Sequence, residues 1–407
     1  GDMRPKLRQI QASLGTWQGR SVIILQDPLG VGESGLAIPR SIAPILELCD
    51  GTRDISALKI ALELRTGLTI PQEYIENMIA GFDEAFLLEN ERFAQAYQEM
   101  VTKFRSAHCR PPILAGRVYP EDPKWLEFTI REYLDAALSE EKATSEIEHI
   151  RGVVSPHIDY KRGGAIYAQV WQRAAAAVQL ADLAIILGTN HFACQKLFTL
   201  TRQHYSSPWG ILNTANDVVD RLVTVLGEDE VFAEEIHHST EHSVEMAAIW
   251  LHYFARNRNL EILPVLCGSF QKFVDGATTP IEDEEIALFV DEVNKATNNR
   301  RTIIIAAGDL AHVGPAFGDH YPVCMPEKAN LLAADSTLIA AIANGDAENM
   351  YLQIKNEGDS RRICGLPPIY LALRLLGETK GELTGYDQCP ADHSGTSFVS
   401  ICGMVLS

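Results

Sequence analysis

The chain has 407 residues, of which 46% are hydrophobic and 22% are charged, so it can bury a substantial core and form more than one domain. Its formal net charge of −19 argues against a nucleic-acid-binding or anionic-membrane surface, because both need clustered lysine and arginine. Without a membrane-length apolar run, a signal-peptide pattern or a C-x-x-C pair among its eight cysteines, the sequence predicts a cytoplasmic protein with reduced thiols.

The first 105 residues predict a small, mainly helical domain. Its expected elements are a strand at 21–25, helices at 39–48, 55–66 and 72–80, and a short closing strand at 86–88. The phrase Ile45-Leu-Glu-Leu-Cys-Asp-Gly-Thr-Arg-Asp-Ile-Ser56 resembles PqqD-like winged-helix domains. This resemblance implies a module that binds a peptide or a partner protein and performs no chemistry itself.

A nucleotide-binding loop is a competing interpretation of this region. Residues Gly30-Val-Gly-Glu-Ser-Gly35 spell G-x-G-x-x-G after the predicted strand. Pro39, however, interrupts the helix that should follow at once, and no second strand ending in an acidic residue appears at the required distance. The pattern therefore favours a turn or hairpin, and we expect neither a nucleotide nor a metal in this domain.

A domain boundary is expected near residue 110. The segment from Glu91 to Ala107 is polar and helical in pattern, and Arg110-Pro-Pro112 ends it, so the second domain is placed at 111–407. Beyond the boundary, strands are expected at 150–155, 184–187, 262–266, 302–306, 381–386 and 397–406, and helices at 164–180, 244–254, 284–296, 329–343 and 367–376. This alternation predicts an α/β fold, with a mostly parallel or mixed sheet and helices on both faces.

Polar side chains follow several of the predicted strands at the point where each strand ends. His157 and His191 each come just after an apolar strand, and Asp309 and His312 come after a third. Because ligands of open α/β sheets bind beyond the carboxyl ends of the strands, we expect these residues at one rim. Imidazole suits iron, copper, zinc and nickel, so the expected cofactor is a single transition-metal ion. Asp309 and His312 could support its ligands or act as general acid and base.

Several phrases of the second domain resemble the Memo family, also called AmmeMemoRadiSam system protein B. They are Ala115-Gly-Arg-Val-Tyr119, Ser155-Pro-His-Ile-Asp-Tyr160, Gly188-Thr-Asn-His191, Glu241-His-Ser-Val-Glu-Met246, Leu263-Pro-Val265, Gly308-Asp-Leu-Ala-His312 and the segment from Cys389 to Ser400. They follow one another along most of the domain. The resemblance implies a fold similar to the class III, LigB-type non-haem iron dioxygenases.

The same resemblance implies roles for individual residues. His157 and His191 take the two histidine ligand positions, and Cys389 takes the position of the family's cysteine. His312 takes the place of the acid/base histidine of the dioxygenases, with Asp309 beside it. Those dioxygenases have a carboxylate as the third ligand, so a thiolate at that position argues against classical ring cleavage.

The matched phrases also contain Asp159, Asn190, Glu241 and His242, which we expect to line the cleft. Glu241 and His242 open a predicted helix, so capping that helix is the alternative role for them. The pair His237-His238 lies on a polar stretch and is expected in solvent.

These features predict a metal-dependent redox enzyme, with iron or copper, that acts on a small-molecule or peptidyl substrate. Two alternatives stay open: a peptide- or protein-binding module without catalytic activity, and a zinc-dependent hydrolase with metal-bound water as the nucleophile. The family's system name implies a radical-SAM protein as a partner, which the N-terminal domain would dock. No nucleic-acid or membrane partner is expected.

Overall fold

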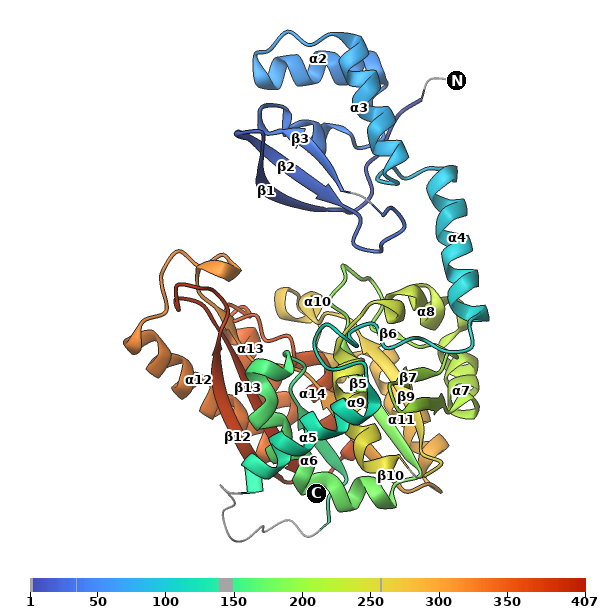
Figure 1. The fold of residues 1–407 in the computed structure, drawn as a ribbon, viewed down its shortest axis with the longest axis vertical. Helices are drawn as coiled ribbons and strands as arrows, with labels where there is room; N and C mark the ends of the chain where they lie inside the picture. The colour runs from blue at the N-terminus through green and yellow to red at the C-terminus, as the bar shows by residue number, and fades with distance from the viewer. Residues whose placement is uncertain (1–2, 34, 139–148, 257) are drawn as a thin grey trace. The chain divides into compact units, whose positions relative to one another are not determined.

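The computed structural model describes residues 3–33, 35–138, 149–256 and 258–407 (Figure 1). The chain forms two compact units, Gly1–Ser106 and Ala107–Ser407. Each unit has buried hydrophobic clusters of its own. Among the described residues, no helix combines the length and apolar character that crossing a membrane requires.

The first unit combines a small antiparallel sheet with helices. Its elements are β1 (Gln11–Trp17), β2 (Arg20–Gln26), β3 (Leu36–Pro39), η1 (Arg40–Ile42), α1 (Ile45–Leu48), α2 (Ile55–Thr66), α3 (Gln72–Glu84) and α4 (Glu91–Ser106). The strands pair in the order β1-β2-β3. Apolar side chains of the sheet and of α1, α2 and α3 share one core, which includes Leu25, Leu58, Ile75 and Phe82.

Several expectations for this unit need revision. The strand β1 was not predicted, because its side chains are almost all exposed and lack apolar alternation. The helix expected at 39–48 is divided into η1 and α1, since Pro44 has no N–H to continue the helical hydrogen bonds. Residues 86–88 form no strand, and Leu88 makes only an isolated bridge with Leu7.

The described part of the G-x-G-x-x-G segment, residues 30–33 and 35, forms a turn, as predicted. The Asp27 carboxylate accepts hydrogen bonds from the backbone N–H groups of Leu29, Val31 and Gly32. The strand β3 follows this segment where a dinucleotide-binding loop would open a helix. The geometry therefore lacks the helix N-terminus on which a pyrophosphate would sit.

The second unit is built on one mixed sheet. Its strands are β4 (Gly152–Ser155), β5 (Leu183–Thr189), β6 (Phe198–Thr199), β7 (Tyr205–Ser207), β8 (Gly210–Thr214), β9 (Glu261–Cys267), β10 (Thr302–Ala307), β11 (His312–Val313), β12 (Gly381–Pro390) and β13 (Phe398–Leu406). Their order is β11-β13-β4-β10-β5-β9-β8-β7, with β12 beside β13 and β6 beside β9. The strands β4, β10, β5, β9 and β8 are parallel, and antiparallel strands lie at both sides of this block.

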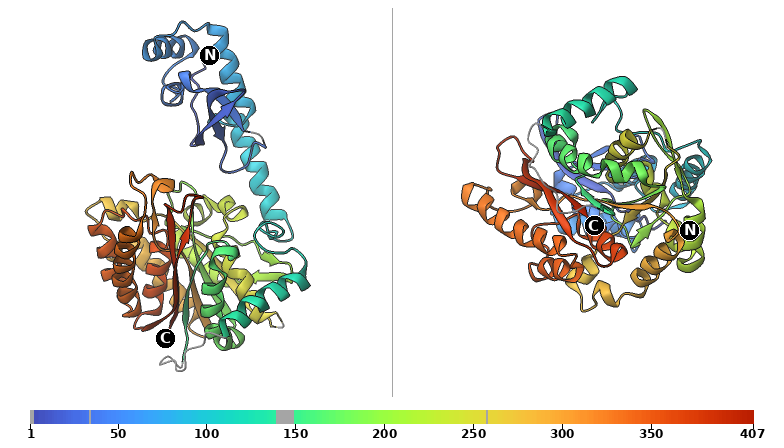
Figure 2. Two further views of the ribbon diagram at one scale, coloured as in Figure 1. Left: turned by 60° about the vertical axis from the view of Figure 1, so that its left-hand side comes forward. Right: turned by 90° about the horizontal axis from the view of Figure 1, so that it is seen from below.

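Helices cover both faces of this sheet (Figure 2). They are α5 (Pro123–Leu138), α6 (Tyr160–Leu180), α7 (Asn216–Leu226), α8 (Glu228–Phe232), η2 (Glu235–Ser239), α9 (Ser243–Ala255), α10 (Gln271–Asp275), η3 (Pro280–Glu282), α11 (Glu284–Thr297), η4 (Pro315–Phe317), α12 (Met325–Ala343), α13 (Ala347–Asn356) and α14 (Leu366–Leu376). Side chains of α5, α6 and α9 pack with Ala184 and Ile186 of β5. Those of α7, α11, α12, α13 and α14 pack with Ile185 and Leu187. Because successive strand residues face opposite sides, these are the two layers of an α/β fold, and that prediction is confirmed.

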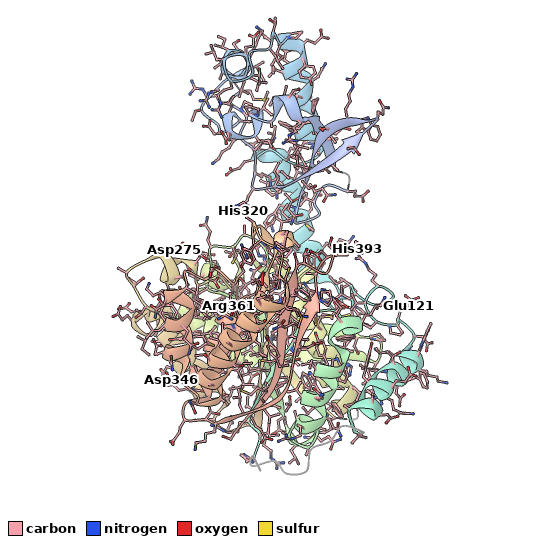
Figure 3. The ribbon with its side chains drawn as sticks, turned by 90° about the vertical axis from the view of Figure 1, so that its left-hand side faces the viewer. Glu121, Asp275, His320, Asp346, Arg361 and His393 are labelled. Carbon is pink, nitrogen blue, oxygen red and sulfur yellow. The ribbon has the colours of Figure 1, made fainter. Side chains whose placement is uncertain are left out.

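The order of the strands creates a polar rim. Because β10 lies between β4 and β5, and all three are parallel, their carboxyl ends meet at the same edge. Those strands end at Ser155, Thr189 and Ala307. Figure 3 shows the loops that carry His320 and His393 at this end of the unit, with Asp346 farther from it. The residues that follow the three strand ends are therefore neighbours in space.

Candidate metal centre

Three histidines meet at the rim. Candidate ligand nitrogens of His157, His191 and His242 all lie within 4.8 Å of one another. The centroid of the His157 ring lies 4.8 Å from that of His191 and 5.2 Å from that of His242. The rings of His191 and His242 are stacked, with their centroids 4.7 Å apart. Among the described residues this is the one group of histidine, cysteine and acidic side chains close enough to hold a metal ion.

The His157 ring is held in one orientation by the neighbouring strand. Its Nδ1 lies 3.0 Å from the carbonyl oxygen of Ala307, the last residue of β10, so Nδ1 carries the hydrogen and donates it. The backbone N–H of His157 donates to the Asp309 carboxylate at 2.9 Å. The tautomer fixed in this way leaves Nε2 with a free lone pair, which is the arrangement of a metal-binding histidine.

Glu241 organises the other two histidines. Its carboxylate accepts hydrogen bonds from Nδ1 of His191 at 2.9 Å and from the His191 backbone N–H at 2.8 Å. It also accepts from the backbone N–H groups of His242 and Ser243, and Nδ1 of His242 lies 3.3 Å away. One buried carboxylate therefore orients the His191 ring and anchors the backbone that carries His242.

Close packing between β5 and α9 brings His242 next to His191. The Ser243 hydroxyl accepts a hydrogen bond from the Thr189 N–H and donates one to the Thr189 carbonyl, both at 3.0 Å. A Cβ on Gly188 would lie only 2.5 Å from the Ser243 oxygen. Glycine is therefore required where the end of β5 meets the first turn of α9.

Burial keeps the cluster largely uncharged at neutral pH. Desolvation lowers the pKa of His157 to about 3 and that of His242 to about 4. Burial also acts to lower the pKa of His191, but its hydrogen bond to Glu241 and the Glu241 charge raise it overall. Burial acts to raise the pKa of Glu241, and the His191 and His242 contacts outweigh it and hold that pKa far below the usual range. The neutral rings of His157 and His242 are in the protonation state that metal binding needs, whereas His191 would release its proton when an ion binds.

His312 and Asp309 lie beside the cluster but do not pair as expected. Nδ1 of His312 lies 2.9 Å from the carbonyl oxygen of Arg362, and its backbone N–H donates to the carbonyl of Arg361 at 2.7 Å. The Asp309 carboxylate accepts from His157 and lies 3.5 Å from Nε2 of that ring. The orienting partner of His312 is therefore a backbone carbonyl, because the Asp309 carboxylate is directed to His157. Nε2 of His312 is left for proton exchange.

The structure does not bring Cys389 into the metal cluster. Its Sγ lies 3.8 Å from both the carbonyl oxygen of Arg162 and the Asp387 carboxylate, within the hydrophobic cluster that contains α6. The thiol that contacts a cluster histidine is that of Cys364, 3.4 Å from Nε2 of His157. The expected ligand set of His157, His191 and Cys389 is thus represented by its two histidines, and His242 is the third.

A cleft of about 240 Å³ opens beside His191. Its walls include Asn190, Cys364 and Arg362, and the first of these was expected there. Asp159 was also expected but caps α6, accepting from the Arg162 N–H and pairing with the Arg162 side chain at 2.6 Å.

The other polar residues singled out near the cluster are buried. Glu241 has 2% of its surface exposed, so it lies behind the histidines and holds them through hydrogen bonds without lining the cleft surface. His237 and His238 were expected in solvent, and that prediction is wrong. His237 pairs with the Asn190 side chain, and His238 lies between the Tyr205 hydroxyl and the Thr199 carbonyl.

Comparison with known proteins agrees with these features. The family model described as Memo-like protein matches residues 110–405. The chain belongs to the Memo family. A MEMO1 family protein of Aquifex aeolicus is 28% identical over 389 residues, which cover 94% of this chain and 95% of that protein. A MEMO1 family protein of Methanosarcina barkeri is 26% identical over 284 residues, which cover 68% of this chain and 91% of its own length.

The two relatives differ in how much of this Memo-family chain they cover. A match over 94% of the chain necessarily includes most of the first unit, so the Aquifex protein has a counterpart of it. The Methanosarcina match leaves about a third of this chain uncovered. Both relatives therefore match much of the second unit, and the Aquifex protein also matches most of the first unit.

Two residues beside this cluster, Cys364 and Arg362, were not among the predicted site residues. Cys364 lies 207 residues from its partner His157, and Arg362 lies 50 residues from its partner His312. Arg362 adopts a positive φ of 54°, a conformation that non-glycine residues rarely take and that often marks a functional position. Its guanidinium donates to the His312 carbonyl at 3.1 Å and pairs with Asp319 at 2.9 Å. The short phrase Arg-Ile-Cys-Gly365 was the signal available.

Proposed function

We propose that this protein is a metal-dependent redox enzyme in which His157, His191 and His242 hold one ion, iron or copper, and the adjoining cleft binds a small-molecule or peptidyl substrate. The observation that carries the proposal is the state of the three rings. Nδ1 of His157 and Nδ1 of His191 are hydrogen-bonded to a carbonyl and a carboxylate oxygen, which leaves their Nε2 atoms for an ion, and a ligand nitrogen of His242 lies within 4.8 Å of both rings' ligand nitrogens.

The donor set fits such an ion. Neutral imidazole suits iron, copper and zinc, and the Cys364 thiol and Asp309 carboxylate lie next to the cluster as further donors. A redox-active ion bound there would supply one-electron chemistry that no side chain of the cluster can perform. The likeness to LigB-type dioxygenases that the family resemblance implies supports the same class of chemistry, with histidine in place of the usual carboxylate ligand.

The residues of the chain have separate tasks in this proposal. His312 holds or releases a proton at Nε2, because the Arg362 carbonyl fixes the hydrogen on Nδ1. The Arg362 guanidinium holds the His312 backbone while Asp319 holds the guanidinium, so the ring is positioned from two sides. Apolar walls of the cleft, such as Phe270 and Leu366, exclude water from one side of a bound substrate.

Metal content of the freshly purified protein tests the proposal. We expect about one iron or copper ion per chain, lost in a variant with His157, His191 and His242 all replaced by alanine. The matched control replaces His237, His238 and His252, which are buried but lie outside the cluster, and should keep its metal. Protein that binds no iron or copper, even when reconstituted without oxygen, would refute the redox function and favour a binding module.

Zinc-dependent hydrolysis is the second candidate, because three histidines with an open position are the ligand set of many catalytic zinc sites. In that case the ion would lower the pKa of a bound water, and His312 would receive its proton. Stoichiometric zinc in the purified protein, together with ester or peptide hydrolysis that chelators abolish, would favour this function. Inactive zinc protein that gains oxidase activity with iron or copper would exclude it.

We propose that the first unit serves recognition in a cytoplasmic protein. The PqqD-like phrase and the compact core of the unit support a module that docks a peptide or a partner protein, with a radical-SAM protein of the same system as the first candidate. Removal of residues 1–105 should leave metal binding unchanged and abolish co-purification with that partner. Unchanged co-purification would refute the docking role.

A further inference from the structure

We propose that Arg110 is a positioning residue of the metal centre, and that it acts by holding the loop that carries Glu241 and His242. The inference rests on the proposed function, since it concerns the same ion, but it gives a task to a residue that the sequence marked only as part of the domain boundary. The geometry that carries it is the place of the guanidinium, which is fully buried and donates to acceptors on both sides of Glu241 along the chain.

The Arg110 side chain spans the connection between η2 and α9. Its Nε donates to the His238 carbonyl at 2.6 Å, and one terminal nitrogen donates to the Glu241 carbonyl at 2.8 Å. The other terminal nitrogen pairs with the Glu245 carboxylate at 2.5 Å. Because a planar guanidinium presents its donors in a fixed arrangement, these three bonds together define where the backbone of Glu241 lies.

Arg110 reaches this loop from a fixed base. Its backbone N–H donates to the His204 carbonyl at 2.7 Å, and its carbonyl accepts from the backbone N–H and the hydroxyl of Ser206 at 3.1 Å and 2.7 Å. The guanidinium carbon lies 4.7 Å from the centre of the Tyr205 ring, a cation–π contact. The backbone is therefore anchored to β7 while the side chain holds the loop.

Glu245 joins the residues that follow Arg110 to the first turns of α9. Besides the guanidinium, its carboxylate accepts from the backbone N–H groups of Ile113 at 3.1 Å and Leu114 at 2.9 Å, and from the Tyr119 hydroxyl at 2.7 Å. Both charged side chains of this ion pair are buried, with 0% and 1% exposed. The segment and the start of α9 thus form one hydrogen-bonded assembly, and a shift in either is passed to the other.

The loop held by Arg110 is the one that supports the cluster. The Glu241 carboxylate orients the His191 ring and accepts from the His242 backbone N–H. Without the guanidinium, the Glu241 carbonyl loses its donor and the connection that carries His242 can move relative to His157 and His191. Loss of Arg110 should therefore weaken metal binding, although no ligand is removed.

Arg110→Lys tests the assignment, because lysine keeps the charge but lacks the planar set of donors. Titration with Co²⁺ in competition with a chelator should show binding about tenfold weaker than in the wild type, the lower end of the effect of losing a group that supports metal ligands. Arg8→Lys is the matched control. The Arg8 side chain is also largely buried, donates to the Phe86 carbonyl and pairs with Asp27, but it belongs to the first unit, so this variant should bind Co²⁺ as the wild type does.

A double variant separates positioning from general destabilisation. If Arg110 acts through Glu241, the combination of Arg110→Lys with Glu241→Gln should bind Co²⁺ about as weakly as Glu241→Gln alone, because the two changes remove the same support. A merely structural arginine predicts that the two losses of affinity multiply. Multiplied losses, or wild-type affinity in a folded Arg110→Lys protein, overturn the assignment and leave the three-histidine site standing.

A further measurement uses the wild-type chain and needs no variant to fold. Coupling between two sites is reciprocal, so bound Co²⁺ should slow hydrogen exchange of the Ile113 and Leu114 N–H groups severalfold, followed by mass spectrometry of peptides. The N–H groups of Val31 and Gly32, which the Asp27 carboxylate holds in the first unit, should exchange at an unchanged rate. Unaltered exchange at Ile113 and Leu114 in the Co²⁺-loaded protein overturns the positioning role alone, whereas failure of the wild type to bind Co²⁺ overturns the metal site together with it.

Discussion

Glu241 offers the sharpest test of the metal centre, because one carboxylate supports two of its three histidines. In Glu241→Gln the side chain keeps its size, but it loses its charge and places an amide group against Nδ1 of His191 or the N–H groups of His242 and Ser243. Loss of such a supporting carboxylate typically costs 10–100-fold in metal affinity. Because Glu241 touches two rings, we expect the upper end, about 100-fold or about 2.7 kcal/mol.

The assay is a Zn²⁺ or Co²⁺ titration in competition with a chelator, at pH 7 and with the melting temperature of each apoprotein measured alongside. Glu235→Gln is the matched control: Glu235 is also buried, lies six residues earlier, and its carboxylate accepts a hydrogen bond from the Thr201 hydroxyl. Its metal affinity should equal that of the wild type. A folded Glu241→Gln protein with a dissociation constant within threefold of the wild-type value would refute the role assigned to Glu241.

Three further predictions concern His312, the buried histidines and the first unit. His312→Ala should keep its metal while turnover falls about 10²–10⁴-fold, measured once a substrate is found; weakened metal binding would make it a ligand, and full turnover would remove it from catalysis. Burial lowers the pKa of His238 to about 3 and of His252 to about 4, so the unfolded chain binds their protons first as pH falls below about 6.5. Between pH about 6.5 and its folded pKa, each of these two histidines should lower the free energy of unfolding by up to about 1.4 kcal/mol for each pH unit that the pH falls. In urea unfolding, the free energy of unfolding of His238→Gln should depend less steeply on pH than that of the wild type, by about one proton. An isolated fragment of residues 1–105 should bind neither a metal nor NAD or FAD by calorimetry, and tight, specific binding of either would contradict the turn found at the G-x-G-x-x-G segment.

The sequence was sufficient for the α/β fold and for much of the rim. The apolar runs of β5 and β10 are recognisable because both faces of those strands are buried, so nearly every residue is hydrophobic. Because these strands are parallel neighbours, the residues that follow their carboxyl ends lie at the same edge of the sheet. This reasoning applies to His157, His191 and Asp309, each two residues beyond its strand, and the structure does gather them.

The parts that the sequence could not supply depend on contacts between distant segments. His242 reaches the cluster through the packing of Ser243 against Gly188, which no local pattern reveals. Cys364 comes next to His157 in a similar way, through a close backbone contact between Gly308 and Gly365. The exposed strand β1 was missed for a different reason, because it lacks the alternating burial on which strand prediction relies.

The supports of the metal centre also explain why its histidines tolerate burial. An unpaired ring nitrogen inside a protein costs free energy unless a partner accepts its hydrogen. Here the Ala307 carbonyl takes that role for His157, the Glu241 carboxylate for His191, and the Arg362 carbonyl for His312. Each Nδ1 donates its hydrogen within the protein, so each Nε2 carries a lone pair that can accept a proton or bind a cation. A cation shared by the Nε2 lone pairs of His157 and His191 is the partner that would complete the pattern, and the arrangement of these rings is therefore stronger evidence for a metal than the number of histidines.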